Sequence, residues 1–187
     1  MFKELNVSIK GVSPLLTHNI QLADPMNQWT KALKEISSKR KKTETDFAEM
    51  SRIEWYGGLY VNSDKRIILP SEVLFGSICG GAKKSKLGKQ FLSGFDVVSD
   101  SILEYDGDKN IDKLWKSGKS TDIRAVSIQR ARIMRTRPIF FNWSVTIKCH
   151  FMEDILNKSQ VVKAIEDAGM YVGVGDYRPR YGRYVII

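Results

Sequence analysis

The residues best suited to chemistry lie close together at positions 173–184. They read Gly-Val-Gly-Asp-Tyr-Arg-Pro-Arg-Tyr-Gly-Arg-Tyr, so three glycines, three arginines and three tyrosines occur within twelve residues. Glycine lets the backbone adopt positive φ and approach a partner closely, arginine offers phosphate a planar fork of donors, and tyrosine offers a ring on which a base can stack. The stretch therefore suits a strand of nucleic acid, and the alternative is a glycine-rich turn with solvated arginines. The candidate contacts in this loop are Gly173, Gly175, Tyr177, Arg178, Arg180, Tyr181, Gly182 and Arg183.

A second run of arginines precedes a long apolar segment. Arg130, Arg132, Arg135 and Arg137 occur within eight residues that contain no acid. In an extended chain the first two share one face and the last two share the other. Because burying four arginines would be costly, we expect all of them to face solvent or phosphate.

The net charge of +9 is unevenly distributed along the chain. Residues 31–42 hold six basic residues against one acid and residues 113–148 hold nine against one, whereas residues 96–112 hold six acids and one lysine. Segregated basic blocks attract polyanions, of which nucleic acid is the commonest. An exposed, solvated face is the alternative. The first block includes a further group of candidate contacts, Lys39, Arg40, Lys41 and Lys42.

Composition is that of a globular chain, with 42% hydrophobic and 27% charged residues. No run reaches the ~20 apolar residues of a membrane helix, and the first residues do not resemble a signal peptide. Cys79 and Cys149 lack metal-type spacing, so we expect two buried thiols in a reducing compartment and a cytoplasmic protein. We predict no metal and no cofactor, because no metal-ligand spacing, Walker loop or nucleophile elbow occurs. His18 is one of two histidines and has no fixed partner in the sequence.

Periodicity predicts the order of the elements. Apolar alternation predicts strands at 5–10, 97–105, 123–128, 139–151 and 185–187, and a hairpin joins 58–61 to 66–69. Ser71 and Ser159 are the expected caps of two amphipathic helices, and Asp24 and Thr43 are expected to begin two helical segments. The outline strand, helix, strands, strand, helix, strand predicts an α+β fold, ferredoxin-like or RRM-like, with helices on one face of an antiparallel sheet. We expect a single domain over 1–187, with a helical, basic insertion at about 24–56 and a surface excursion at about 106–120.

Three segments, in order, resemble the RAMP superfamily, in particular the backbone subunits of CRISPR effector complexes. The first expected strand runs into Gly11-Val12-Ser13-Pro14-Leu15-Leu16, which is similar to the opening of those proteins. The segment from Ile68 to Ile78, with Pro70-Ser71-Glu72, resembles the one in which a proline and a serine start a helix near the guide strand. The segment from Gly173 to Arg183 is similar to their C-terminal glycine-rich loop.

The resemblance implies a non-catalytic protein that binds single-stranded RNA or DNA. Copies would assemble head to tail along the strand as a homo-oligomer or filament, or as a subunit of a ribonucleoprotein. Stand-alone chains of this kind resemble products of phages or mobile elements, which act inside a bacterial host and for which single-stranded DNA would be the ligand. Some relatives are metal-independent endoribonucleases, for which His18 and Asp24 are the matching catalytic candidates. A third reading is a protein-interaction subunit that mimics part of a ribonucleoprotein.

Overall fold

Two stretches of the chain, Thr17–Tyr60 and Gly107–Ile139, fold together as one compact unit, and the remaining residues form a second. The computed structural model describes residues 1–128 and 131–187. We call the unit of residues 1–16, 61–106 and 140–187 the sheet unit, and the other the helical unit. Both predicted excursions lie within the helical unit, which also takes most of the arginine-rich strand.

The sheet unit has the ferredoxin-like arrangement that the sequence predicts. Its main sheet has the strand order β4-β8-β1-β9, and every neighbouring pair is antiparallel. Among the elements between β1 and β4 is the helix α3, and α6 lies between β8 and β9. With the inserted segments set aside, the path of the main sheet is therefore strand, helix, strand, strand, helix, strand. The α+β prediction is therefore confirmed. The elements of this unit are β1 (Phe2–Gly11), β2 (Leu15–Leu16), β3 (Ile68–Leu69), α3 (Ser71–Ala82), η2 (Lys83–Ser85), α4 (Gly88–Gly94), β4 (Phe95–Val97), β5 (Ser101–Ile102), β8 (Ser144–Met152), α6 (Lys158–Asp167), η3 (Ala168–Val172) and β9 (Tyr184–Ile186).

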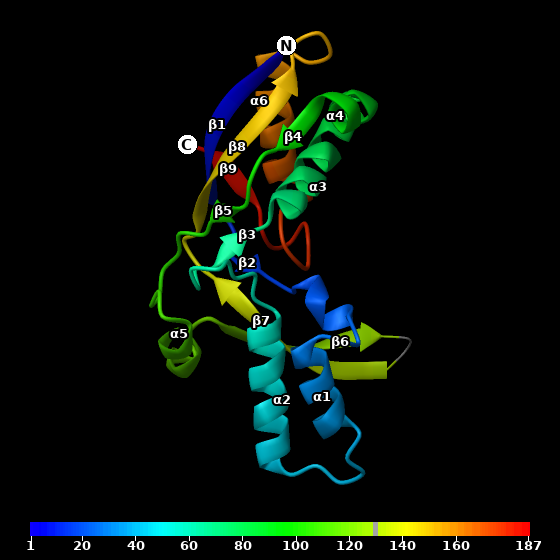
Figure 1. The fold of residues 1–187 in the computed structure, drawn as a ribbon, viewed down its shortest axis with the longest axis vertical. Helices are drawn as coiled ribbons and strands as arrows, with labels where there is room; N and C mark the ends of the chain where they lie inside the picture. Colours follow the sequence, from blue (N-terminus) through cyan, green and yellow to red (C-terminus); the bar gives the residue numbers. More distant parts are fainter. Residues whose placement is uncertain (129–130) are drawn as a thin grey trace. The chain divides into compact units, whose positions relative to one another are not determined.

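One face of this sheet is buried under helices and the other is open. Along the β1–β8 ladder, Ile9 pairs with Val145, and both are buried, whereas Ser8 pairs with Thr146 on the open face. Alternate residues point to opposite faces, so a single ladder separates core from surface. α3 and α6 lie beside each other over the buried face (Figure 1). A Cβ on Gly81 would lie 2.2 Å from the Ala164 carbonyl oxygen, so this glycine lets the two helices approach closely.

Two predicted strands are interrupted in the structure. The strand expected over 97–105 is divided, because β4 ends at Val97 and β5 occupies only Ser101–Ile102. The strand expected over 139–151 is divided by a turn in which Asn142 adopts φ +47°. Asn142 also donates a hydrogen bond to Asp106 over 2.6 Å. Apolar alternation alone does not register such a turn, since its residues continue the alternating pattern.

Not all helix starts have the caps that the sequence predicts: Pro70 and Asn157, rather than Ser71 and Ser159, are the caps of α3 and α6. Thr43 caps α2 through a capping box, as predicted. Asn27, rather than Asp24, caps α1, so that helix begins three residues later than expected. At the start of α3 the carboxylate of Asp100, distant in sequence, accepts a hydrogen bond from the Ser71 amide over 2.8 Å.

Aromatic rings hold the helical unit together. The Trp55 indole is buried and donates a hydrogen bond to the Ser120 carbonyl over 2.8 Å, which joins the two segments of this unit. Trp115 packs against Trp55 with ring centroids 5.3 Å apart. The Tyr56 hydroxyl donates to Asp112 over 2.7 Å, and burial, helped by that carboxylate, raises the pKa of Tyr56 to about 12. The elements are η1 (Ile20–Ala23), α1 (Gln28–Ser37), α2 (Glu44–Gly57), α5 (Ile111–Ser117), β6 (Thr121–Ile128) and β7 (Ala131–Phe140), the last residue of which belongs to the sheet unit.

Both cysteines are free and buried, which confirms the predicted thiols. Burial raises the pKa of Cys149 to about 12 and also raises that of Cys79. Neither thiol is therefore a good nucleophile at neutral pH. Among the described residues, no helix combines the length and apolar composition that crossing a bilayer requires.

Candidate nucleic-acid interface

The glycine loop (residues 173–183) is fastened to the segment that follows β1. The Asp176 amide donates to the Leu16 carbonyl over 2.8 Å, and the Gly182 amide donates to the Pro14 carbonyl over 2.8 Å. These two bonds hold both ends of the loop against the same short piece of chain. The loop is therefore a fixed part of the sheet unit.

Close backbone contacts explain the glycines of this loop. Gly173, Gly175 and Gly182 have φ between +71° and +80°, a region that other residues rarely adopt. A Cβ on Gly182 would lie 1.7 Å from the Val174 carbonyl oxygen, and one on Gly175 would lie 2.4 Å from that of Leu16. The backbone thus folds back on itself at distances that only glycine permits.

Beneath the loop, apolar and hydroxyl groups fix its inner side. The Ser77 hydroxyl donates to the Gly173 carbonyl over 2.7 Å, and the Val174 side chain is fully buried. Tyr184 is also buried, with its ring 6.3 Å from that of Trp143 in an edge-on arrangement. Burial raises the pKa of Tyr184, so this tyrosine is a neutral anchor and not a surface ring.

The three arginines of the loop face outward. Arg178, Arg180 and Arg183 are exposed, and none of them forms an ion pair with any described residue. Arg183 Nε donates to the Pro179 carbonyl over 2.9 Å, which leaves its remaining donors directed elsewhere. Because the charges are unneutralised, the loop is a site of positive potential on a fixed backbone.

Two tyrosines border a hollow beside these arginines. Tyr177 is 44% exposed, and Tyr171, at the end of η3, is 52% exposed. The Lys84 ammonium lies 5.7 Å from the centre of the Tyr171 ring, a cation–π distance. Tyr181 is only half-buried and meets Tyr177 edge-on at 6.0 Å. The hollow has a volume of about 520 Å³ and is lined by Lys84, Tyr171, Val172, Gly175, Asp176, Tyr177, Arg178 and Pro179.

Tyr171 and Lys84 are absent from the residues that sequence reasoning selects. Tyr171 follows an amphipathic helix and precedes the first glycine of the loop, Gly173, by two residues, so its position resembles the end of a helix face. Lys84 lies in a lysine-rich segment that sequence alone cannot place beside the loop. The signal that could identify Tyr171 is an aromatic residue next to a glycine-rich turn.

The prediction for the β7 arginines is wrong for two of them. Arg132 is exposed, as expected, and Arg130 lies outside the described residues. Arg135, however, forms an ion pair with the buried carboxylate of Glu54, and Arg137 is only 9% exposed. The prediction of an exposed strand is made because residues 130–137 contain no acid. Glu54, which lies in α2 far away in sequence, supplies the negative charge that pairs with Arg135.

Two of the four basic residues at 39–42, Lys39 and Lys42, form contacts within or next to the loop between α1 and α2. The Lys39 ammonium lies 2.6 Å from Asp46 Oδ1 and, by that hydrogen bond, lowers the pKa of Asp46 to about 2. Lys42 Nζ donates to the Lys39 carbonyl over 2.9 Å. Arg40 and Lys41 are exposed. This group and the β7 arginines belong to the helical unit, whereas the glycine loop belongs to the sheet unit.

Asp24, one of the two catalytic candidates, has the contact of a turn residue, and His18, the other, accepts a hydrogen bond with its backbone carbonyl. Asp24 Oδ1 accepts a hydrogen bond from the Met26 amide over 2.8 Å, which is an Asx turn before α1. The His18 carbonyl accepts a hydrogen bond from the Tyr60 hydroxyl over 3.3 Å, and both candidate side chains are exposed. Within residues 1–128 and 131–187 no cluster of three or more His, Cys, Asp or Glu is arranged to hold a metal ion.

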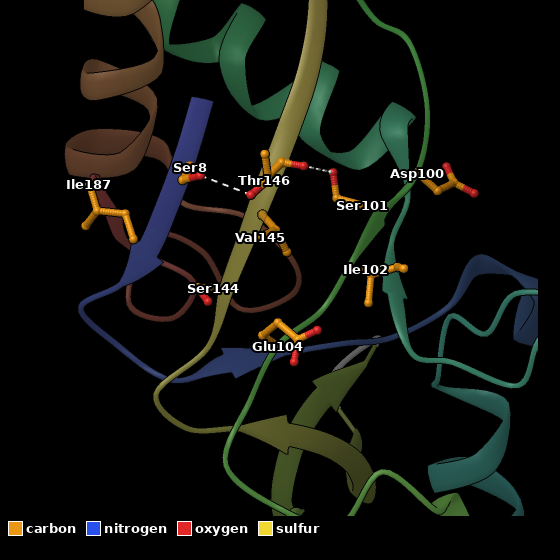
Figure 2. Close-up of a pocket in the computed structure, with 9 residues that line it drawn as sticks. All are labelled: Ser8, Asp100, Ser101, Ile102, Glu104, Ser144, Val145, Thr146 and Ile187. Atoms are coloured by element: carbon orange, nitrogen blue, oxygen red, sulfur yellow. Dashed lines mark hydrogen bonds between the residues drawn. The ribbon is translucent and has the colours of Figure 1, made fainter. Parts of the chain in front are cut away.

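The open face of the sheet offers a different kind of surface. A hollow of about 470 Å³ there is bordered by hydroxyl groups, and Figure 2 shows Ser8 joined to Thr146, and Thr146 to Ser101, by hydrogen bonds. Asp100 and Glu104 also line it, and no lysine or arginine does. Among the described residues, the strands direct no tyrosine or tryptophan to this face. RRM domains stack bases on aromatic residues of the sheet, and on this face the exposed Phe2 ring lies 6.3 Å from that of His150. The hollow itself, with two carboxylates and no basic residue, is poorly suited to a polyanion.

No protein-family model and no curated protein sequence matches this chain. Function is therefore inferred from the residues of the site.

Proposed function

We propose that this protein is a non-catalytic binder of single-stranded nucleic acid and that the glycine loop is its contact site. The observation that carries the proposal is the combination of a rigid loop with three exposed arginines that no described carboxylate neutralises. A loop that is already ordered loses little conformational entropy when a ligand binds.

The chemistry of the loop divides between phosphates and bases. Arg178 and Arg180 are suited to phosphate contacts, because a guanidinium donates two parallel hydrogen bonds to a phosphate. Tyr177 presents a partly exposed ring, and a stacked base contributes about 1–3 kcal/mol. Stacking on such a ring requires an unpaired base, so a single strand is the favoured ligand over a duplex.

We extend the proposal to ancestry and assembly. A ferredoxin-like sheet with a glycine-rich loop between the last helix and the last strand supports a RAMP relationship. A chain of that kind would bind RNA or single-stranded DNA as a repeated, head-to-tail assembly or as a ribonucleoprotein subunit. Contacts between unlike surfaces of identical copies generate open filaments.

The test is binding of labelled single-stranded RNA, single-stranded DNA and duplex over a salt series. We expect tight single-strand binding that weakens with salt, since phosphate contacts release counterions. Arg178→Glu/Arg180→Glu should abolish it. A matched control, Lys3→Glu/Lys158→Glu, makes the same change of charge on exposed lysines of the sheet unit and should retain it.

Two outcomes would overturn the proposal. If the wild type binds none of the three nucleic acids, a protein partner becomes the better candidate. If cut RNA accumulates in the same tubes and His18→Ala abolishes the cleavage, the endoribonuclease reading replaces the non-catalytic one.

A further inference from the structure

A cluster of lysines follows α3 in the sheet unit. Lys83, Lys84, Lys86 and Lys89 lie within seven residues, and all four are exposed. We call residues 83–89 the lysine turn. None of the four lysines forms an ion pair with a described residue.

One carboxylate, that of Asp167 in α6, contacts the lysine turn, and it already has two partners within the protein. Asp167 accepts a hydrogen bond from Ser85, a member of the turn, over 3.3 Å. Its other oxygen lies 2.7 Å from Lys163 Nζ, and that contact raises the pKa of Lys163. Asp167 is 5% exposed, and its two oxygens contact Ser85 and Lys163 and form an ion pair with none of the four lysines of the turn. The positive charge of the turn is therefore left for an external anion.

The backbone turns at Lys86, and three of the lysines line a hollow beside this turn. Lys86 has φ +61°, the left-handed conformation that ends η2, and the Leu87 amide donates to the Ala82 carbonyl over 3.0 Å. The chain reverses here before α4 begins. A hollow of about 410 Å³ results, and its lining is Lys83, Lys86, Gly88, Lys89, Gln90 and Leu92.

The lysine turn and the glycine loop are continuous at the surface. Lys84 belongs to the turn, yet it also lines the hollow that Tyr177 and Arg178 border. The Tyr171 ring, over which the Lys84 ammonium lies, is more than half exposed. A basic path with exposed rings therefore leads from the loop to the turn within one unit.

We propose that the lysine turn is a second phosphate-binding segment for the same strand, reached from the glycine loop by way of Tyr171 and Lys84. This inference rests on the proposed function. Lysine is a compact point charge without the planar fork of arginine, so the turn attracts successive phosphates without fixing their orientation. A short strand would occupy the glycine loop alone, and a longer one would occupy both segments.

The test compares Lys83→Gln/Lys89→Gln, two lysines that line the hollow of the lysine turn and not that of the glycine loop, with the control Lys3→Gln/Lys158→Gln. Strands of about 4 and about 16 nucleotides, the range of single-strand site sizes, are titrated over a salt series. Loss of two phosphate contacts should reduce the slope of log K against log salt by about 1.4 for the long strand, and leave the short strand unchanged. Equal slopes for the variant and the control with the long strand would overturn the inference.

The Arg178→Glu/Arg180→Glu variant separates this inference from the proposed function. If that variant loses both strand lengths while the lysine variant behaves as its control, only the lysine turn is excluded. If the wild type binds neither length, both proposals fall. An unchanged urea midpoint verifies that the lysine variant is folded.

Photo-crosslinking gives an independent readout on the unmodified protein. A long strand that contains 4-thiothymidine should crosslink to peptides with residues 83–92 or Tyr171, in addition to the glycine loop. Crosslinks confined to the loop, or only to the helical unit, would contradict the proposed path. A wild type that binds no strand but retains an acidic peptide at the lysine turn would assign that surface to a protein partner instead.

Discussion

The glycine loop and strand β7 each hold three described arginines, but the two regions use them differently. In the loop, glycine-dependent backbone contacts fix the chain, and the arginines are free to point outward. In β7, Arg137 is buried and Arg135, with 29% of its side chain exposed, pairs with Glu54, so of the three arginines described there only Arg132 is neither buried nor half-buried. In the glycine loop, glycines allow the backbone contacts that fix the chain. In β7, an arginine forms the ion pair that links the strand to α2.

The difference teaches that an arginine-rich sequence becomes a binding surface only where no acid from elsewhere in the chain reaches it. Glu54 belongs to α2, and it satisfies Arg135 with one oxygen and the Thr136 amide, over 2.8 Å, with the other. Net charge counted along the sequence cannot register such a pair. Four substitutions or titrations test this distinction, in decreasing order of expected effect.

Gly182→Ala should disturb the loop most. The left-handed φ of +71° costs a non-glycine residue about 1 kcal/mol, and displacement of the Val174 carbonyl costs roughly 2 kcal/mol more. Urea unfolding should record both terms, and nucleic-acid binding should weaken. Gly118→Ala is the matched control, because its φ is +67° but no atom lies within 4 Å of its Cβ, so about 1 kcal/mol is expected. Equal losses at both sites would show that the Val174 contact does not fix the loop.

Glu54→Ala should destabilise the helical unit by roughly 3 kcal/mol, because it leaves Arg135 and the Thr136 amide without their acceptor. Urea unfolding measures the loss. Glu35→Ala, an exposed acid of α1, serves as control and should change stability by less than about 0.5 kcal/mol. A stable Glu54→Ala protein with tighter nucleic-acid binding would mean that Arg135 is a latent contact, and the contrast between the two regions would fail.

Arg135→Gln and Arg178→Gln should have opposite signatures. The first should lower the free energy of unfolding by about 1.5 kcal/mol, the value of a hydrogen bond to a charged group, and leave the salt slope of binding unchanged. The second should leave stability within about 0.5 kcal/mol and reduce the slope by about 0.7. If Arg135→Gln instead reduced the salt slope and Arg178→Gln lowered stability, β7 would be the binding region and the loop arginines would be structural.

The smallest effect concerns acid pH and the loop between α1 and α2. Lys39 lowers the pKa of Asp46 to about 2, below the ordinary value of 3.8. A lowered pKa in the folded state means that the contribution of this cap to α2 is present above about pH 4 and is lost as the pH falls toward 2. NMR titration of the Asp46 carboxyl should give a midpoint near 2, and Lys39→Gln should move it upward. A midpoint near 4 in the wild type would contradict the structural use of Lys39.

Much of the sheet unit follows from sequence because its signals are local. The alternation of apolar and polar residues along 5–10 identifies β1. In the helical unit, the capping residue Thr43 likewise identifies the start of α2. The order of strands and helices then suffices for the ferredoxin-like outline. Apolar alternation fails where the chain leaves the sheet within an otherwise regular pattern, as it does between Val97 and Ser101 and at the turn formed by Asn142.

The features that the sequence does not predict depend on contacts between segments that are distant in sequence. The carboxylate that pairs with Arg135 and the one that caps the Ser71 amide both come from other elements. Lys84 likewise reaches the border of the glycine loop only through the packing of α3 and its following turn. The residues of the loop itself were selected by composition, and their role in binding stays a prediction.

The interleaved segments of the two units set an order for biosynthesis. Residues 17–60 leave the ribosome before their partner segment, which begins at Gly107, and at roughly 5–20 residues per second they wait several seconds for it. The glycine loop follows later still, and Pro14 and Leu16, to which it is fastened, are made more than 150 residues before it. A nascent chain therefore carries its basic segments long before it has a formed loop. The proposed binding of a strand would therefore require the glycine loop to have been made and fastened to Pro14 and Leu16.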